Sequence, residues 1–214
     1  MTSSDQTEAV DGGPGLERTI TLTDAVVAIA MTLLVLPLVE IADEVDLAQP
    51  REVLTEHWDL LLSFVVSFLV IFIFWSAQGA AYRRLAESGA TASGLRQLTM
   101  WWLLLIAFLP FPTAVIGREL TTVTAPLYVG TVLVLSVLTS TIAVLVGRAT
   151  GRRAGAAWIT TGVLAVCTVI CLVNAAAGMY GLLALVVVRV GEGWWLRRRA
   201  RYPGTPDARA TRAG

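Results

Sequence analysis

Six long apolar segments constrain this chain more than any other feature of its sequence. An α-helix rises about 1.5 Å per residue, so a segment of roughly twenty residues crosses about 30 Å of hydrocarbon. Backbone polar groups in lipid must be satisfied within the segment, which favours helices. We therefore predict an all-α integral membrane protein with six transmembrane helices per subunit, and a turn at residues 174–178 divides the last two. The six segments are residues 20–38, 60–82, 98–117, 126–147, 156–174 and 179–196.

Composition argues against other classes of protein. The 214 residues are 56% hydrophobic, with a mean hydropathy of +0.70. The formal net charge is zero, so no global field attracts nucleic acid. No nucleophile elbow, phosphate loop or pair of carboxylates lies in the segments, and we expect neither an enzyme nor a bound cofactor. Cys167 and Cys171 lie four residues apart in one apolar segment. We interpret them as small buried residues, with a disulfide or metal site as the lesser alternative.

The arginines predict the orientation in the membrane. All sixteen basic residues are Arg, and cytoplasmic loops carry an excess of positive charge. The loops after the first, third and fifth segments together have only two arginines, Arg51 and Arg118, so these loops are expected on the outside. We predict a multi-pass protein of the cell membrane with both termini cytoplasmic, which agrees with an even number of spans. Residues 1–16 and 200–214 are expected to be disordered tails that flank a transmembrane domain over residues 17–199. The arginines on the predicted cytoplasmic side are Arg18, Arg83, Arg84, Arg96, Arg148, Arg152, Arg153, Arg197, Arg198, Arg199 and Arg201.

The first predicted outside loop, residues 40–59, is acidic. Its carboxylates face a single cation, Arg51. Such a loop can be an ordinary solvated connection, or it can raise the local cation concentration at a pore mouth. The carboxylates are Glu40, Asp43, Glu44, Asp46, Glu52, Glu56 and Asp59.

Polar residues interrupt the first apolar segment. Asp24 lies inside it, and Arg18 lies just before it. A carboxylate inside a membrane helix costs several kcal/mol unless it is paired or hydrated. Helical spacing also predicts one face of small and apolar residues with a single hydroxyl. Ile29 lies at the centre of this face, and Asp24 lies about 140° away from Ile29 around the helix axis. Helix packing is the ordinary explanation of such a face, whose residues are Leu22, Ala25, Ile29, Thr32, Leu33 and Leu36.

The same segment resembles a known family. Arg18, Leu22-Thr23-Asp24-Ala25, Ala28-Ile29 and Thr32-Leu33-Leu34-Val35-Leu36 are similar to the opening of the prokaryotic branch of the transmembrane protein 175 potassium channels. That branch has Arg-x-x-x-Phe-Ser-Asp-Gly, followed by Ala-Ile-x-x-Thr-Leu-Leu-Val-Leu. Here Leu, Thr and Ala replace its Phe, Ser and Gly. Weaker similarities lie at Ser63-Phe64, Trp75 and Leu109-Pro-Phe-Pro-Thr113, and Gln78 stands where the family has His.

The resemblance implies a homotetramer with the first helix of each subunit on the axis. Ile29 would form a hydrophobic constriction and Thr32 a hydroxyl layer, with Leu33 and Leu36 on the same face. Potassium would be the permeant ion, and the partners would be further copies of this chain and membrane lipid. No internal filter motif of the Thr-Val-Gly-Tyr-Gly type is present or needed.

The resemblance also implies a polar network of Arg18, Thr23, Asp24 and Gln78 that ties the first helix to its own subunit. The alternative is that Arg18 and Asp24 extend to the cytoplasmic headgroups. Gln78 cannot titrate, so any pH sensitivity that the family's His contributes should be missing here. Pro37 is expected to kink the helix and to free the Leu33 carbonyl.

We therefore expect a passive, leak-type potassium-selective cation channel. One alternative is a proton- or cation-coupled transporter, for which Asp24 is the available titratable group. Another is a membrane scaffold that conducts no ions.

Overall fold

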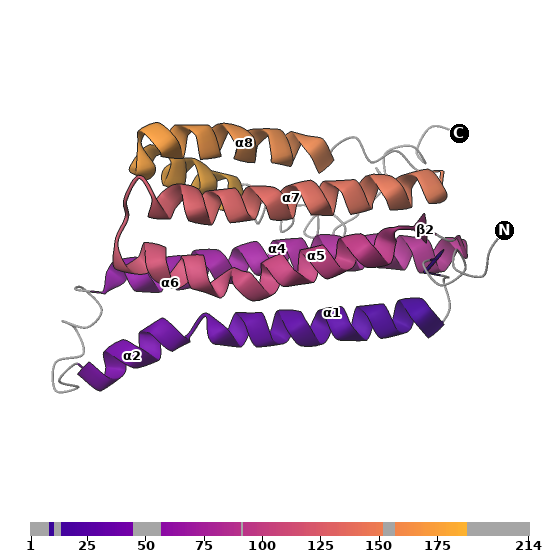
Figure 1. The fold of residues 1–214 in the computed structure, drawn as a ribbon, viewed down its shortest axis with the longest axis horizontal. Coiled ribbons are helices and arrows are strands. Elements are labelled where there is room, and N and C mark those ends of the chain that lie inside the picture. The colour runs from indigo at the N-terminus through magenta and orange to yellow at the C-terminus, as the bar shows by residue number, and fades with distance from the viewer. Residues whose placement is uncertain (1–8, 11–13, 45–56, 91, 152–156, 188–214) are drawn as a thin grey trace, which may run out of the picture.

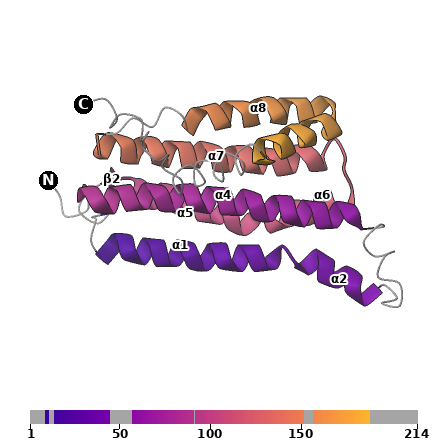
Figure 2. The ribbon, with the colours of Figure 1, turned by 180° about the vertical axis from the view of Figure 1, so that it is seen from behind.

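The computed structural model describes residues 9–10, 14–44, 57–90, 92–151 and 157–187. In this part of the chain, long helices lie side by side in layers (Figure 1). α1 forms one outer layer, α4, α5 and α6 the next, α7 the third, and α8 lies on the opposite outer side. The view from behind shows the same order (Figure 2). The acidic residues of the loop from 45 to 56, the end of the sixth segment and most of both tails lie outside the described residues.

The first apolar segment is divided in two. α1 (Pro14–Leu33) is followed by a two-residue turn and then by α2 (Leu36–Glu44). Pro37 has no N–H to donate, and the next donors, Leu38 and Val39, both bond to the Val35 carbonyl. The predicted kink at Pro37 is therefore confirmed (Figure 1).

α1 begins earlier than the hydropathy predicts, at Pro14 instead of residue 20. Proline is tolerated in the first turn of a helix, where its N–H would lack a partner anyway. Leu16 is fully buried and Thr19 is nearly so, and their packing extends the helix. The strands β1 (Ala9–Val10) and β2 (Ala92–Ser93) pair in antiparallel orientation. The chain therefore has two short strands, whereas the sequence predicts an all-α protein. β1 also lies within residues 1–16, which were expected to be disordered.

The middle of the chain supplies three long spans. α4 (Trp58–Ser88) is one continuous helix that ends at Gly89 with a positive φ of 61°. α5 (Leu95–Phe108) and α6 (Pro110–Arg118) form a single span that is bent at Leu109, because Pro110 cannot bond to the preceding turn. α7 (Thr124–Ala149) crosses back and contacts α4, α5 and α6.

The last two helices are shorter within the described residues. α8 (Ala157–Val173) is followed by a helix over Ala175–Val187. The expected five-residue turn is a single residue, because the Asn174 side chain accepts a hydrogen bond from the Ala177 N–H and caps the new helix at once. The sixth helix therefore begins at 175 and not at 179.

The cysteines lie where these two helices cross. Cys167 and Cys171 are free and buried. A Cβ placed on Gly178 would lie 2.1 Å from the Cys171 Sγ, and one on Gly181 would lie 2.9 Å from the Cys167 Sγ. Small residues allow helices in membranes to approach closely, so the expectation that the cysteines are small buried residues is confirmed.

Buried hydroxyl groups join the layers. The Ser67 hydroxyl lies 2.9 Å from both the Tyr128 hydroxyl and the Thr113 hydroxyl, which connects α4, α7 and α6. The Trp102 indole donates to Thr139, which connects α5 with α7. Hydrogen bonds of this kind stabilise helix packing in a membrane, because the lipid hydrocarbon offers the polar groups no other hydrogen-bond partner.

The described residues contain four helices that are long and apolar enough to cross a membrane. They are Gly15–Ile41, Trp58–Ser88, Leu95–Arg118 and Thr124–Ala149. Two shorter apolar helices, Trp158–Val173 and Ala175–Val187, follow them. Six helical segments are thus present in the predicted order, with the first and third bent at proline.

Candidate functional site

The candidate site is the side of α1 that its own subunit leaves uncovered. Ile29 is 60% exposed, Leu36 is 50% exposed and Leu33 is 39% exposed, and Thr32 is exposed as well. These residues belong to an i, i+3, i+4 stripe that runs along α1 into the start of α2. The predicted face therefore exists as a face, and nothing in the described part of the subunit packs on it.

The opposite side of α1 holds the helix in place. It packs on α4 and α5. The two sides lie about 135° apart around the helix axis, at roughly 100° per residue. Because one side is engaged with the subunit, the exposed stripe has a defined direction. The buried residues of α1 and the following turn are Leu16, Thr19, Thr23, Val27, Ala30 and Leu34.

Thr32 presents its oxygen in a particular way. Its hydroxyl donates to the Ile29 carbonyl at 2.7 Å. The proton is thereby committed to the backbone, and the lone pairs of the oxygen remain available on the exposed side. A hydroxyl in this state can accept from water or coordinate a cation, whereas the Ile29 side chain next to it can do neither.

Asp24 has a partner that the sequence analysis did not assign. The Trp75 indole Nε1 donates to the Asp24 Oδ1 at 2.7 Å, which ties α1 to α4. Trp75 is one of the residues that resemble the family, but the predicted network does not include it. The indole N–H stabilises the carboxylate without neutralising its charge.

Thr23 and Gln78 are buried, as a network would require. The Gln78 amide donates to the Tyr82 hydroxyl at 2.9 Å, and that hydroxyl lies 2.8 Å from the Thr99 hydroxyl. The Thr23 hydroxyl donates to the Thr19 carbonyl and also interacts with the Tyr82 hydroxyl. Tyr82 is therefore the centre where α1, α4 and α5 meet.

The sequence analysis missed Tyr82 and Thr99 as members of the network. Their signal was weak but present. Tyr82 follows Gln78 by one helical turn, and Thr99 is a hydroxyl near the start of an apolar segment. The Gln78 Oε1 atom is buried without a hydrogen-bond partner among the described residues, so the network satisfies only one end of that amide.

Arg18 does not join this network. It is exposed, and it has no hydrogen-bond or ion-pair partner among the residues that the structure describes. Asp24 lies six positions after Arg18, which places the two side chains about 120° apart around α1 and about 9 Å apart along it. The predicted network of Arg18, Thr23, Asp24 and Gln78 is therefore divided into two separate groups. Asp24 contacts Trp75, and Thr23 contacts the group formed by Gln78, Tyr82 and Thr99.

One ion pair lies at the far end of the bundle. Arg118, at the end of α6, pairs with Glu40 of α2. Both side chains are more than half exposed, so the pair contributes little to stability. Glu40 belongs to the predicted acidic loop, but the structure places it in the helix α2, and residues 45–56 of that loop lie outside the described residues.

The first part of the chain matches a known family of proteins. A model of the endosomal/lysosomal potassium channel TMEM175 family matches residues 18–110. This range runs from the first turns of α1 to the bend between α5 and α6, so the resemblance noted in the sequence is confirmed there. No curated protein matches the sequence.

A solved structure extends the comparison in three dimensions. The chain is similar to the crystal structure of a lysosomal potassium-selective channel TMEM175 homolog from Chamaesiphon minutus. The TM-score is 0.69 at 22% sequence identity, and the match covers 84% of this chain and 98% of the other. At this identity the match establishes a shared fold, which includes the helices beyond residue 110.

Proposed function

We propose that this chain is the subunit of a potassium-selective cation channel whose ion pathway is lined by the exposed stripe of α1. The observation that carries the proposal is the 60% exposure of Ile29 on a helix that is otherwise held against α4 and α5. The family match over residues 18–110 and the shared fold support the same function. The channel is passive, and potassium is its permeant ion and not a cofactor.

Four copies of the chain form the pore in this proposal. A single helical stripe cannot enclose a pathway, so conduction requires closed symmetry around the α1 face. In the subunit α1 is an outer layer, with no other described helix on its far side (Figure 1). A homotetramer brings four such layers to a common axis and leaves α8 and the last helix at the periphery, toward lipid.

Ile29 supplies the constriction. Four isoleucine side chains around an axis make a narrow apolar ring, which conducts only when water and ions enter it. An ion that passes must give up part of its hydration without receiving a ligand. Potassium holds its water less tightly than sodium, so the ring penalises sodium more.

Thr32 lies one helical turn beyond Ile29 and supplies oxygen ligands next to the apolar ring. Its proton is already donated to the Ile29 carbonyl, so the oxygen faces the pathway as an acceptor. A ring of four such oxygens can replace part of the water that an ion loses. Leu33 and Leu36 extend the lining toward the kink before α2.

The chain lies in the cell membrane with both termini on the cytoplasmic side. The start of α1, the end of α4, the start of α5 and the end of α7 share one end of the bundle, and these helix ends carry Arg18, Arg84, Arg96 and Arg148. Among the described residues, the other end carries Glu40, Asp59 and Glu119 beside one arginine, Arg118. This charge asymmetry supports the orientation.

Potassium flux from proteoliposomes tests the function. Purified protein in vesicles loaded with potassium should release it down its gradient at a rate that does not saturate and needs no proton gradient. Saturating flux that is coupled to protons would indicate a transporter that uses Asp24, and absence of flux in tetrameric protein would indicate a scaffold. Either result would overturn the proposal.

A further inference from the structure

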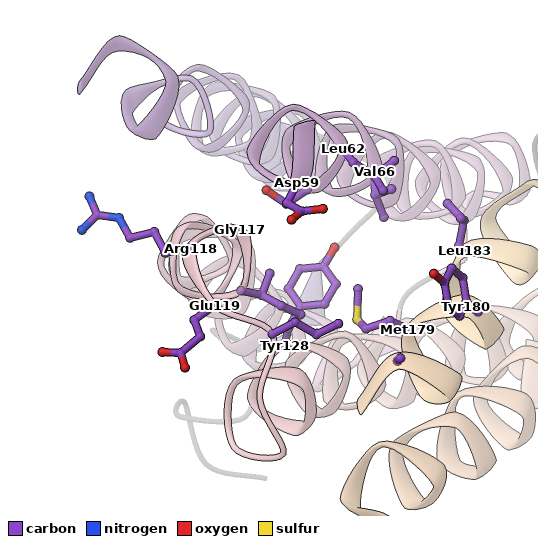
Figure 3. Close-up of a pocket in the computed structure, with 14 residues that line it drawn as sticks. Asp59, Leu62, Val66, Gly117, Arg118, Glu119, Tyr128, Met179, Tyr180 and Leu183 are labelled. Carbon is purple, nitrogen blue, oxygen red and sulfur yellow. The ribbon is translucent and has the colours of Figure 1, made fainter. Parts of the chain in front are cut away.

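A cavity of about 190 Å³ lies between α4, α6, α7 and the helix Ala175–Val187 (Figure 3). It is at the end of the bundle where α4 begins and α6 ends. No residue of α1 lines it. The cavity therefore lies on the opposite side of the central layer from the proposed ion pathway, and ion conduction gives it no role.

The wall of the cavity suits one aromatic ring. Leu62, Val66, Met179 and Leu183 contribute apolar surface, and the Tyr128 ring forms a buried part of the lining. An apolar cavity of about 150 Å³ is known to hold benzene in another protein, so the present volume accommodates a ring with a short substituent. Gly117 keeps α6 close to α4 here, because a Cβ at that position would lie 2.6 Å from atoms of Leu60 and Ser63.

One carboxylate faces this cavity without a counter-charge. Figure 3 shows Asp59 and Met179 around the Tyr128 ring, while Arg118 and Glu119 extend away from it. Arg118 is paired with Glu40 of α2. Asp59 is an exposed residue in the first turn of α4, and it has no hydrogen-bond or ion-pair partner among the described residues.

The remaining polar groups of the lining do not offer a competing charge. The Tyr128 hydroxyl is engaged by Ser67 at 2.9 Å, so its ring face is what the cavity presents. The Ser63 hydroxyl donates to the Leu60 carbonyl at 2.9 Å. Tyr180 is 70% exposed at the rim, where a second aromatic face can meet a cation that enters.

We propose that this cavity binds a small aromatic ammonium compound, with the ring between Tyr128, Met179 and Leu183 and the ammonium group on the Asp59 carboxylate. Both parts of the ligand have a complement: apolar wall and aromatic faces for the ring, and one unpaired negative charge for the cation. A ligand of this size binds with a dissociation constant on the order of 1 mM. The site is separate from the pore lining and does not depend on conduction.

Thermal unfolding of the purified full-length protein in detergent tests the charge. Benzylammonium should raise the midpoint of unfolding of the native protein, and benzyl alcohol and benzoate at equal concentration should raise it less. Asp59→Asn should weaken the benzylammonium effect by roughly three- to tenfold in concentration. Glu119→Gln removes a carboxylate of the same rim that points away, and it should leave the effect unchanged. Equal stabilisation by benzyl alcohol, an unchanged response in Asp59→Asn or no stabilisation at all would overturn the proposal.

Photolabelling of the native protein with 4-azidobenzylammonium tests the location and needs no variant. Adducts should map to Met179, Tyr180 or Leu183, and unlabelled benzylammonium should compete with them. Adducts on Ile29 or Leu36 instead would place the ligand in the ion pathway and overturn the proposal. Because both experiments use protein that need not conduct, their failure is distinct from failure of the channel assignment.

Discussion

The Trp75 indole N–H donates to the Asp24 carboxylate at 2.7 Å, from the middle of α4 to the middle of α1, across 51 residues of sequence. This contact fixes how α1 is rotated against its own subunit. Since the exposed stripe lies on another side of the same helix, the rotation also decides where Ile29 and Thr32 point. A polar contact far from the proposed pathway thereby orients the pathway.

Removal of this contact should harm folding and assembly more than ion selectivity. We expect Asp24→Ala to lower the yield of folded tetramer, because it leaves the Trp75 N–H without a partner. A double-mutant cycle of Asp24→Ala and Trp75→Phe should give a coupling energy of about 1 to 2 kcal/mol in unfolding titrations. A well-folded Asp24→Ala tetramer with a changed ion preference would contradict this expectation.

The buried Tyr82 hydroxyl should contribute more to stability than its neighbour Gln78. Tyr82→Phe leaves the Gln78 amide without any partner and should cost about 1 to 3 kcal/mol of unfolding free energy. Gln78→Leu removes an amide whose Oε1 is already unpaired, and the Tyr82 and Thr99 hydroxyls still bond to each other, so it should cost less. Unfolding titrations of the two variants check the order, and the reverse order would mean that the network is not centred on Tyr82.

Ile29→Asn should raise total current and reduce discrimination of potassium over sodium. An amide at the constriction keeps water in the ring, so ions pass with less dehydration. Reversal potentials under biionic potassium and sodium conditions measure the change. If current and reversal potential both stay as in the native protein, the stripe contacts protein or lipid and the pathway lies elsewhere.

Thr32→Val tests the hydroxyl at nearly constant side-chain shape. The substitution removes the oxygen that faces the pathway together with its hydrogen bond to the Ile29 carbonyl. We expect lower conductance or poorer discrimination with tetramer assembly intact, which size-exclusion chromatography checks alongside the same electrical recording. Thr32→Ser keeps the hydroxyl and serves as the matched control. A native current in Thr32→Val would exclude the hydroxyl ring from selectivity.

Gly178→Ala should destabilise the protein by about 1 to 3 kcal/mol through overpacking. The added Cβ would lie 2.1 Å from the Cys171 Sγ and 2.8 Å from the Cys171 backbone N, and the backbone cannot move aside easily. Gly162→Ala in α8 is the control, because a Cβ there has nothing within 4 Å and the helix propensity of Ala should make it neutral or stabilising. Comparison of their unfolding midpoints decides whether the close crossing of the last two helices matters.

Within the described residues, the sequence by itself determined the number and order of the apolar helices. Hydropathy is a local property, and a residue's preference for lipid does not depend on its partner. The same holds for the kink at Pro37, since a missing N–H breaks a bond within the same helix. Helical periodicity also separated the stripe of Ile29 and Thr32 from Asp24.

The tertiary structure decided which residues meet across helices. Trp75 and not Arg18 is the partner of Asp24, and Tyr82 and not Gln78 is the centre of the buried group. It also decided that α1 begins at Pro14, because Leu16 finds a buried site there, and that the last turn is Asn174 alone. These contacts depend on how one helix is rotated and shifted against another. Side chains far apart in the sequence determine that packing geometry together, so no local sequence pattern predicts it.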